Sequence, residues 1–158
     1  MKKIVTTFLA GIFSLALFIP AGCGNYNAEI YDNAQIYLKE EYAEENNPRN
    51  KNPEGLNDTV TKIINDYASF NNAFESFPEN IDFDNKIVVL YFFTDIYAKR
   101  NCKINSIKLR GGDLKILINH KRAVSCARVK DASSPTLRCL AVIMDKIEID
   151  TVDFIINY

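Results

Sequence analysis

After residue 56, apolar residues recur in short runs of the length of β-strands. Residues 87–93 form a continuous run of apolar, β-prone side chains, which predicts a central strand covered on both faces. Two further runs, 102–109 and 114–119, flank the pair Gly111-Gly112, and this arrangement is typical of a β-hairpin. The pattern therefore predicts strands that pair antiparallel with their neighbours in the chain.

One helix is expected before the central strand. Residues 59–64 are β-prone, and Asn65-Asp66 then offers an N-terminal cap. An apolar stripe at helical spacing follows, and Pro78 ends it. The stripe consists of Tyr67, Phe70, Phe74 and Phe77.

Two apolar segments remain near the carboxyl end. Residues 137–144 predict a further strand, and the near-alternation from 147 to 156 predicts one or two closing strands. The expected fold class is therefore α+β and mainly β, a small antiparallel sheet or sandwich with one short helix packed on it.

The amino terminus has a different pattern, in which an apolar run follows a positive start. Lys2 and Lys3 precede an apolar segment over 4–19, and Pro20 closes it. This order is typical of a secretory signal peptide, which is removed from the mature protein. The alternative is a membrane-spanning helix, but a span needs about 20 apolar residues. We therefore expect residues 1–22 to be a signal peptide for export.

The end of this leader, Ala21-Gly22-Cys23, resembles the lipobox of bacterial lipoproteins, with Pro20 where an aliphatic residue is usual. The resemblance implies that Cys23 becomes diacylated and anchors the protein to a bacterial membrane in the cell envelope. The alternative is ordinary cleavage near Ala21, which leaves Cys23 as a free or bridged thiol.

Residues 23–55 are expected to form a lipidated and largely disordered tether. Asn, Glu, Lys and Tyr dominate there, and residues 44–53 include no apolar side chain. Such a segment buries too little surface to offset its ordering entropy. Helical spacing of apolar residues allows one short helix over 34–43. The β-rich globular domain is expected over residues 56–158.

The pairing of the cysteines depends on Cys23. Lipidation leaves three cysteines and one spare thiol, whereas four free cysteines allow three pairings. An exported protein can form disulfides, and Cys126 with Cys139 is the pairing we favour, ahead of Cys102 with Cys126. The other interpretation is that these cysteines are small, buried hydrophobic residues.

The order of these signals is itself distinctive over residues 59–144. A β-segment leads into a capped helix, then Ile81-Asp82-Phe83-Asp84 precedes a strong strand, a glycine hairpin and a Pro-containing loop before the last apolar strand. This layout resembles the PrcB-like family of small exported, protease-complex-associated domains. The family's Thr-Gly-Gly-Tyr-like turn is replaced by 94–100, which lacks both glycines. The resemblance implies an interaction domain that in some members binds or stabilises a protease, and it transfers no functional residue.

Candidate catalytic chemistry depends on the one histidine, His120. A Ser or Cys hydrolase would need an orienting carboxylate and a nucleophile beside it, and no elbow-type motif surrounds the nearby hydroxyl and thiol groups. Zinc sites need paired ligands at fixed spacings, which this sequence lacks. We therefore expect no enzyme, no metal and no small-molecule cofactor, with a hydrolase using His120 as the alternative.

Net charge is −1, from 19 basic and 20 acidic residues, so nothing points to a nucleic acid partner. Basic residues nevertheless gather in the hairpin, where Lys108, Arg110 and Lys115 are candidates for a docking patch facing an acidic partner or anionic lipid headgroups. The alternative is a solvated face whose lysines discourage aggregation. The sequence thus predicts a membrane-anchored, non-enzymatic binding or accessory domain that engages another envelope or secreted protein, or else a purely structural envelope component.

Overall fold

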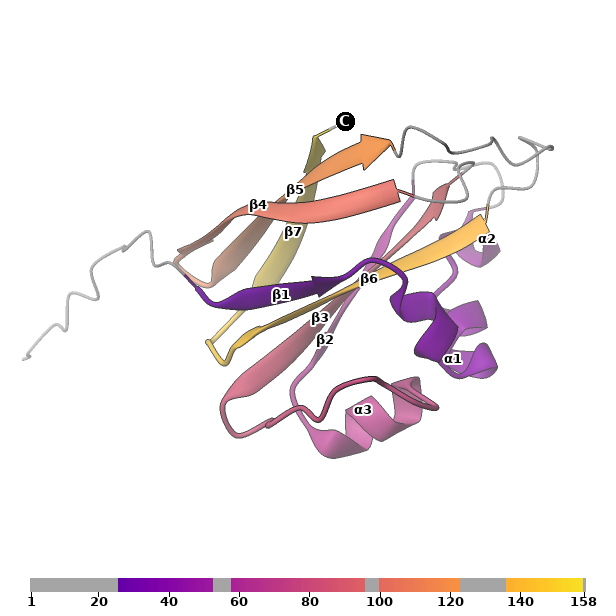
Figure 1. Ribbon diagram of the computed structural model, residues 1–158, viewed down its shortest axis with the longest axis horizontal. Coiled ribbons are helices and arrows are strands. Elements are labelled where there is room, and N and C mark those ends of the chain that lie inside the picture. Colours follow the sequence, from indigo (N-terminus) through magenta and orange to yellow (C-terminus); the bar gives the residue numbers. More distant parts are fainter. Residues whose placement is uncertain (1–25, 53–57, 96–99, 123–135, 158) are drawn as a thin grey trace, which may run out of the picture.

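In the computed structural model, which describes residues 26–52, 58–95, 100–122 and 136–157, two sheets pack face to face (Figure 1). The four-stranded sheet has the order β1 (Ala28–Tyr31), β6 (Thr136–Asp145), β3 (Lys86–Asp95) and β2 (Val60–Ile64). The three-stranded sheet has the order β4 (Arg100–Arg110), β5 (Asp113–Arg122) and β7 (Thr151–Asn157). The predicted fold class, α+β and mainly β, is confirmed.

The central strand expected from the apolar run at 87–93 is β3. It pairs antiparallel with β6 along its length, from Lys86 opposite Asp145 to Asp95 opposite Thr136. Alternate side chains of β3 enter two separate apolar cores, one on each face of the sheet. All residues of β3 from Ile87 to Phe92 are between 0% and 8% exposed, so the prediction of a strand buried on both faces is confirmed.

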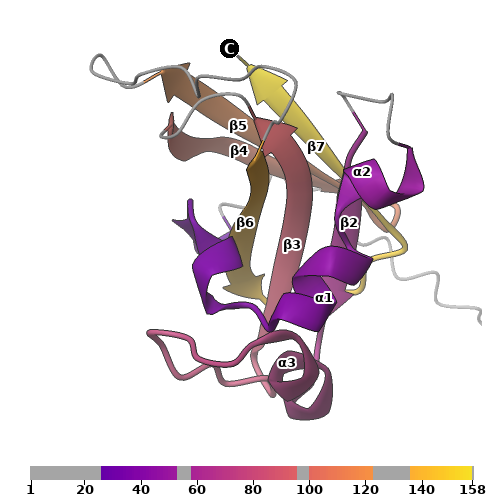
Figure 2. The ribbon, with the colours of Figure 1, turned by 90° about the vertical axis from the view of Figure 1, so that its right-hand side faces the viewer.

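Short helices cover the face of the four-stranded sheet that points away from the three-stranded sheet (Figure 2). They are η1 (Ala34–Tyr37), α1 (Glu40–Glu45), α2 (Pro48–Lys51) and α3 (Tyr67–Ala73). The longest of them within the described part of the chain is too short to cross a bilayer. More than one helix therefore packs on the sheet, whereas the sequence pattern had predicted a single one.

Helix α3 begins as predicted and ends earlier than predicted. The Asp66 side chain accepts a hydrogen bond from the Ser69 backbone N–H at 2.7 Å, which caps the first turn. The helix ends at Ala73, because Phe74 forms a bridge with Leu38 instead of continuing the helix. Phe77 still reaches the aromatic cluster, with its ring 4.9 Å from that of Phe74.

Residues 26–52 belong to the fold, which corrects the prediction of a largely disordered tether over 23–55. Strand β1 pairs antiparallel with β6, from Ala28 opposite Met144 to Tyr31 opposite Ala141. Ala34 and Leu38 then enter the helical-side core, where they are 0% and 7% exposed. The few apolar residues of this segment are stabilised because β6 and α3 already supply a backbone partner and an apolar surface.

The hairpin of β4 and β5 forms around Gly111 and Gly112, whose φ angles are +58° and +89°. Strand β7 closes the same sheet, but it pairs parallel with β5 and not antiparallel as the sequence had suggested. The reason is topological. The chain leaves β6 in the other sheet and enters β7 beside the hairpin turn, where the Asp150 N–H donates to the Gly112 carbonyl at 2.9 Å.

Candidate functional site

The outer face of the three-stranded sheet brings together the three basic residues predicted from the sequence. Lys108 lies directly opposite Lys115 in the register of β4 and β5, and both are exposed. Arg110 is exposed two positions nearer the turn, opposite Asp113. Like charges directly opposite each other destabilise a sheet, and Asp153, the neighbour of Lys115 on β7, offsets part of this repulsion.

A β-bulge extends this basic row along β4. The register shifts between Ile104 and Ser106, which turns Ile104 toward the core and leaves Lys103 on the outer face, opposite Asn119. In the sequence, the three-residue spacing of Ile104 and Ile107 within a strand is the signal for this bulge. We define the outer basic face as Lys103, Lys108, Arg110 and Lys115.

Two apolar side chains lie on the same surface, Leu117 on the central strand β5 and Ile155 on the edge strand β7, and sequence reasoning missed them. Leu117 on β5 is the register partner of Ser106 on one side and of Ile155 on the other. Ile155 is 42% exposed, unusually open for a large aliphatic side chain in this protein. An apolar centre with a charged rim is the usual arrangement of a protein-binding surface.

Charge changes sign across this sheet. On the described part of β4, every charged side chain that points outward is positively charged. On β7, the outward-pointing charged side chain is Asp153, which lies next to Lys115 in the register. Asp113 accepts a hydrogen bond from the Thr151 hydroxyl at 2.7 Å near the turn. An ion pair between Lys86 and Asp145 lies on the other sheet.

The sandwich is closed along the side where β1 meets β4. The Cys102 backbone N–H donates to the Asp32 carboxylate at 3.0 Å, which links the two sheets. Burial raises the pKa of Asp32, while this hydrogen bond and the positive charge of Arg138 act in the opposite direction. This carboxylate therefore has a structural role at the closed side.

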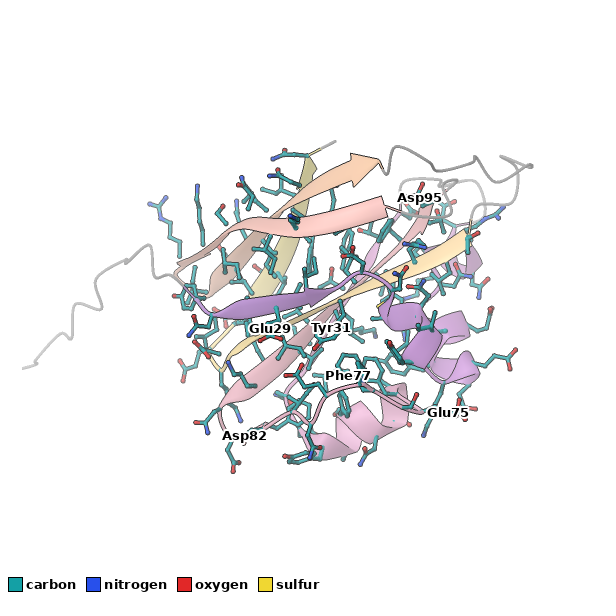
Figure 3. All side chains as sticks on the ribbon, viewed as in Figure 1. Glu29, Tyr31, Glu75, Phe77, Asp82 and Asp95 are labelled. Carbon is teal, nitrogen blue, oxygen red and sulfur yellow. The ribbon has the colours of Figure 1, made fainter. Side chains whose placement is uncertain are left out.

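A shallow hollow of about 500 Å³ lies beside β1 and the loop that follows α3, with Glu29 and Asp82 in its wall (Figure 3). The Tyr31 hydroxyl donates a hydrogen bond to Glu79, and this bond, together with burial, raises the pKa of Tyr31 to about 12. Asp82 accepts from the Asp84 backbone N–H at 3.0 Å and so stabilises a turn. Within the part of the chain that the structure covers, no group of acidic, Cys or His residues is arranged to hold a metal ion.

A second hollow of about 510 Å³ lies where β2 ends and the chain enters β7. Ile63 and Asn65 form one wall, and the linker from Lys146 to Asp150 forms the other. Ile63 is 41% exposed there. Figures 1 and 2 place the edges β2 and β7 on the same side of the sandwich, opposite the closed side of β1 and β4.

Cys139, which the sequence predicted to pair with Cys126, is a free thiol in the structure. Cys139 is 0% exposed and lies in the core beneath the helices, and this burial raises the pKa of its thiol. It therefore behaves as the buried hydrophobic residue of the other interpretation. Cys126 and the predicted lipidation site Cys23 lie outside the described residues. The backbone of His120 is opposite Cys102 in β5, and its side chain is also outside the described part.

Comparisons with protein-family models, with curated proteins and with solved structures find no match for this chain. The functional assignment accordingly depends on the geometry of the two sheets and on the sequence.

Proposed function

We propose that this protein is an exported, lipid-anchored binding domain, and that its outer basic face docks an acidic segment of another envelope protein. The observation that carries the proposal is the gathering of Lys103, Lys108, Arg110 and Lys115 on one exposed face, where Lys108 lies directly opposite Lys115. An acidic partner would remove this repulsion on binding.

The centre of the face favours a protein over a membrane surface as the partner. Leu117 and Ile155 add apolar contact area between the cations, and protein interfaces combine such a centre with a polar rim. Headgroups of anionic lipids would use the charges and leave these side chains without a contact. The layout resemblance to the PrcB-like family makes a protease the first partner to test.

Export and anchoring are the second part of the proposal. They are supported by the sequence of the first 23 residues, with its positive start, apolar run and closing Ala21-Gly22-Cys23. A diacylated Cys23 would hold the domain at the membrane stably, since two acyl chains are enough where one is marginal.

The test reverses the charge of the face. In the full chain, Lys108, Arg110 and Lys115 are all replaced by Glu, and binding of a fluorescent polyglutamate peptide is followed by anisotropy at low and at high salt. We expect the wild-type protein to bind at low salt and to lose binding as salt rises, and the triple variant to bind at least about tenfold more weakly.

The matched control replaces Lys39, Lys51 and Lys62 by Glu, which changes the net charge equally at positions away from this face. Binding that falls equally in both triple variants would reduce the effect to net charge. The proposal is overturned if the wild-type protein binds anionic vesicles but not the acidic peptide, and if the triple variant of the face no longer binds the vesicles. The face would then be assigned to lipid.

A further inference from the structure

Within the described residues, strand β7 is an edge of the three-stranded sheet that is protected by one charged side chain, Asp153. Natural edge strands carry lysine, proline or a bulge that discourages pairing with a second chain. β7 spans Thr151–Asn157 without Lys, Pro or Gly, and its register with β5 runs without irregularity. The opposite edge, β4, is protected in three ways: by its lysines, by the bulge at Ile104/Ser106 and by its contact with β1.

The core-facing side chains of β7 are incompletely covered. Val152, Phe154 and Ile156 are only partly buried, although Phe154 stacks on Tyr91 with the rings 4.5 Å apart. The corresponding side chains of the neighbouring strand β5 are fully buried: Leu114, Ile116 and Ile118 are 1%, 0% and 0% exposed. Among the described residues, no row of apolar side chains covers the core on the outer side of β7.

The hollow between β2 and the start of β7 provides space on this same side. Ile63 lies on its β2 wall, and Ile147 and Ile149 lie on the linker that enters β7. Apolar side chains of an added strand would lie beside these isoleucines and complete the open side of the sandwich. On the closed side, β1 and β4 already perform this function.

The charges at this edge define the polar positions of the added strand. Asp153 points outward from the middle of β7, and Glu148 and Asp150 are exposed just before it, against a single exposed cation, Lys146. A side chain directly across from Asp153 is favoured when it is positively charged.

We propose that β7 accepts an extended segment of a partner protein as an additional strand, and that this segment alternates apolar side chains with lysine or arginine. The backbone groups on the outer side of β7 supply the hydrogen bonds, and the alternating side chains supply the specificity. This edge borders the outer basic face, and Asp153 and Ile155 lie where the two meet. The inference is carried by the backbone edge of β7 and does not depend on the function proposed for that face.

The test uses the full chain in detergent and a fluorescent peptide that alternates valine and lysine over seven residues, the length of β7. We expect saturable binding by anisotropy, and slower hydrogen–deuterium exchange at residues 151–157 in the complex. Ile155→Lys, which adds the missing edge lysine at an exposed position, should weaken binding about tenfold. Ile36→Lys, at a position 67% exposed on η1, is the matched control and should leave binding unchanged.

A second variant tests the charge preference without altering the edge backbone. In the wild-type protein, the valine–lysine peptide should slow exchange at residues 151–157 more than a valine–glutamate peptide does. Asp153→Asn should reduce this difference between the two peptides. The proposal is overturned if exchange slows elsewhere than in β7, if neither peptide binds, or if both peptides protect β7 equally. It is also overturned if β7 becomes protected with rising protein concentration alone, because a second copy of the chain would then be the occupant.

Discussion

Gly112 holds the turn between β4 and β5 in a backbone conformation that other residues adopt only with strain. Its φ is +89°, and a Cβ placed there would lie 2.0 Å from a carboxylate oxygen of Asp150. The carbonyl of Gly112 also accepts the Asp150 N–H, so the turn and the start of β7 are joined at this one residue. A side chain at this position would disturb both.

We expect Gly112→Ala to lower the free energy of unfolding by about 1–3 kcal/mol, from the positive φ and the displacement of Asp150. Gly111→Ala is the matched control, because its φ is +58° and no atom lies within 4 Å of its Cβ position. This control should cost only about 1 kcal/mol. Urea denaturation followed by circular dichroism compares the two, and equal losses would contradict the steric argument.

At the scale of elements, β1 and η1 place the start of the folded domain well before residue 56. β1 covers the edge of β6, and the segment after it buries Ala34 and Leu38 beneath the helices. A domain that started at residue 56 would leave β6 with an open edge and the core with missing side chains.

Two truncated chains test this boundary, one starting at residue 24 and one at residue 56. The shorter chain should unfold at a clearly lower temperature or fail to fold, since loss of a buried leucine such as Leu38 alone costs roughly 2–5 kcal/mol. Thermal unfolding measured by circular dichroism gives the comparison. Equal melting temperatures would show that residues 26–52 add nothing to the fold, and Leu38→Ala in the longer chain separates the core contact from the strand.

Elements with strong local signals could be predicted from the sequence. The uninterrupted apolar run gave β3, the paired glycines gave the hairpin, and Asp66 gave the start of α3. Elements that depend on distant partners could not be predicted. β1 is only four residues long and is stabilised by pairing with β6. The parallel direction of β7 depends on a crossover between sheets.

The candidate site was predictable to the same extent. Strand alternation correctly grouped Lys108, Arg110 and Lys115 on one exposed face, because they lie close to the hairpin turn. The position of Cys139 in the core beneath the helices could not be predicted, because sequence spacing does not show which core a strand residue enters. Leu117 and Ile155 were missed because their contact is made across the parallel pair.

At the scale of the whole molecule, anchoring through Cys23 has a direct test. Cells expressing the full chain are grown with radiolabelled palmitate, and we expect label in the wild-type protein and none in Cys23→Ser. Mass spectrometry of the purified protein should show loss of residues 1–22. Retention of Met1 on a protein found in the soluble intracellular fraction would contradict both export and lipidation.

Because β1 begins soon after Cys23, a lipid-anchored protein would be held close to the membrane surface. Only residues 24–27 separate Cys23 from Ala28, and a chain of this length reaches at most about 18 Å even when fully extended. β1 begins at the end of the sandwich that carries the β4–β5 turn, so that end would stand against the lipid headgroups (Figure 1). The protein would diffuse in two dimensions with its long axis raised from the bilayer, and only molecules within this narrow layer above the membrane would come within its reach.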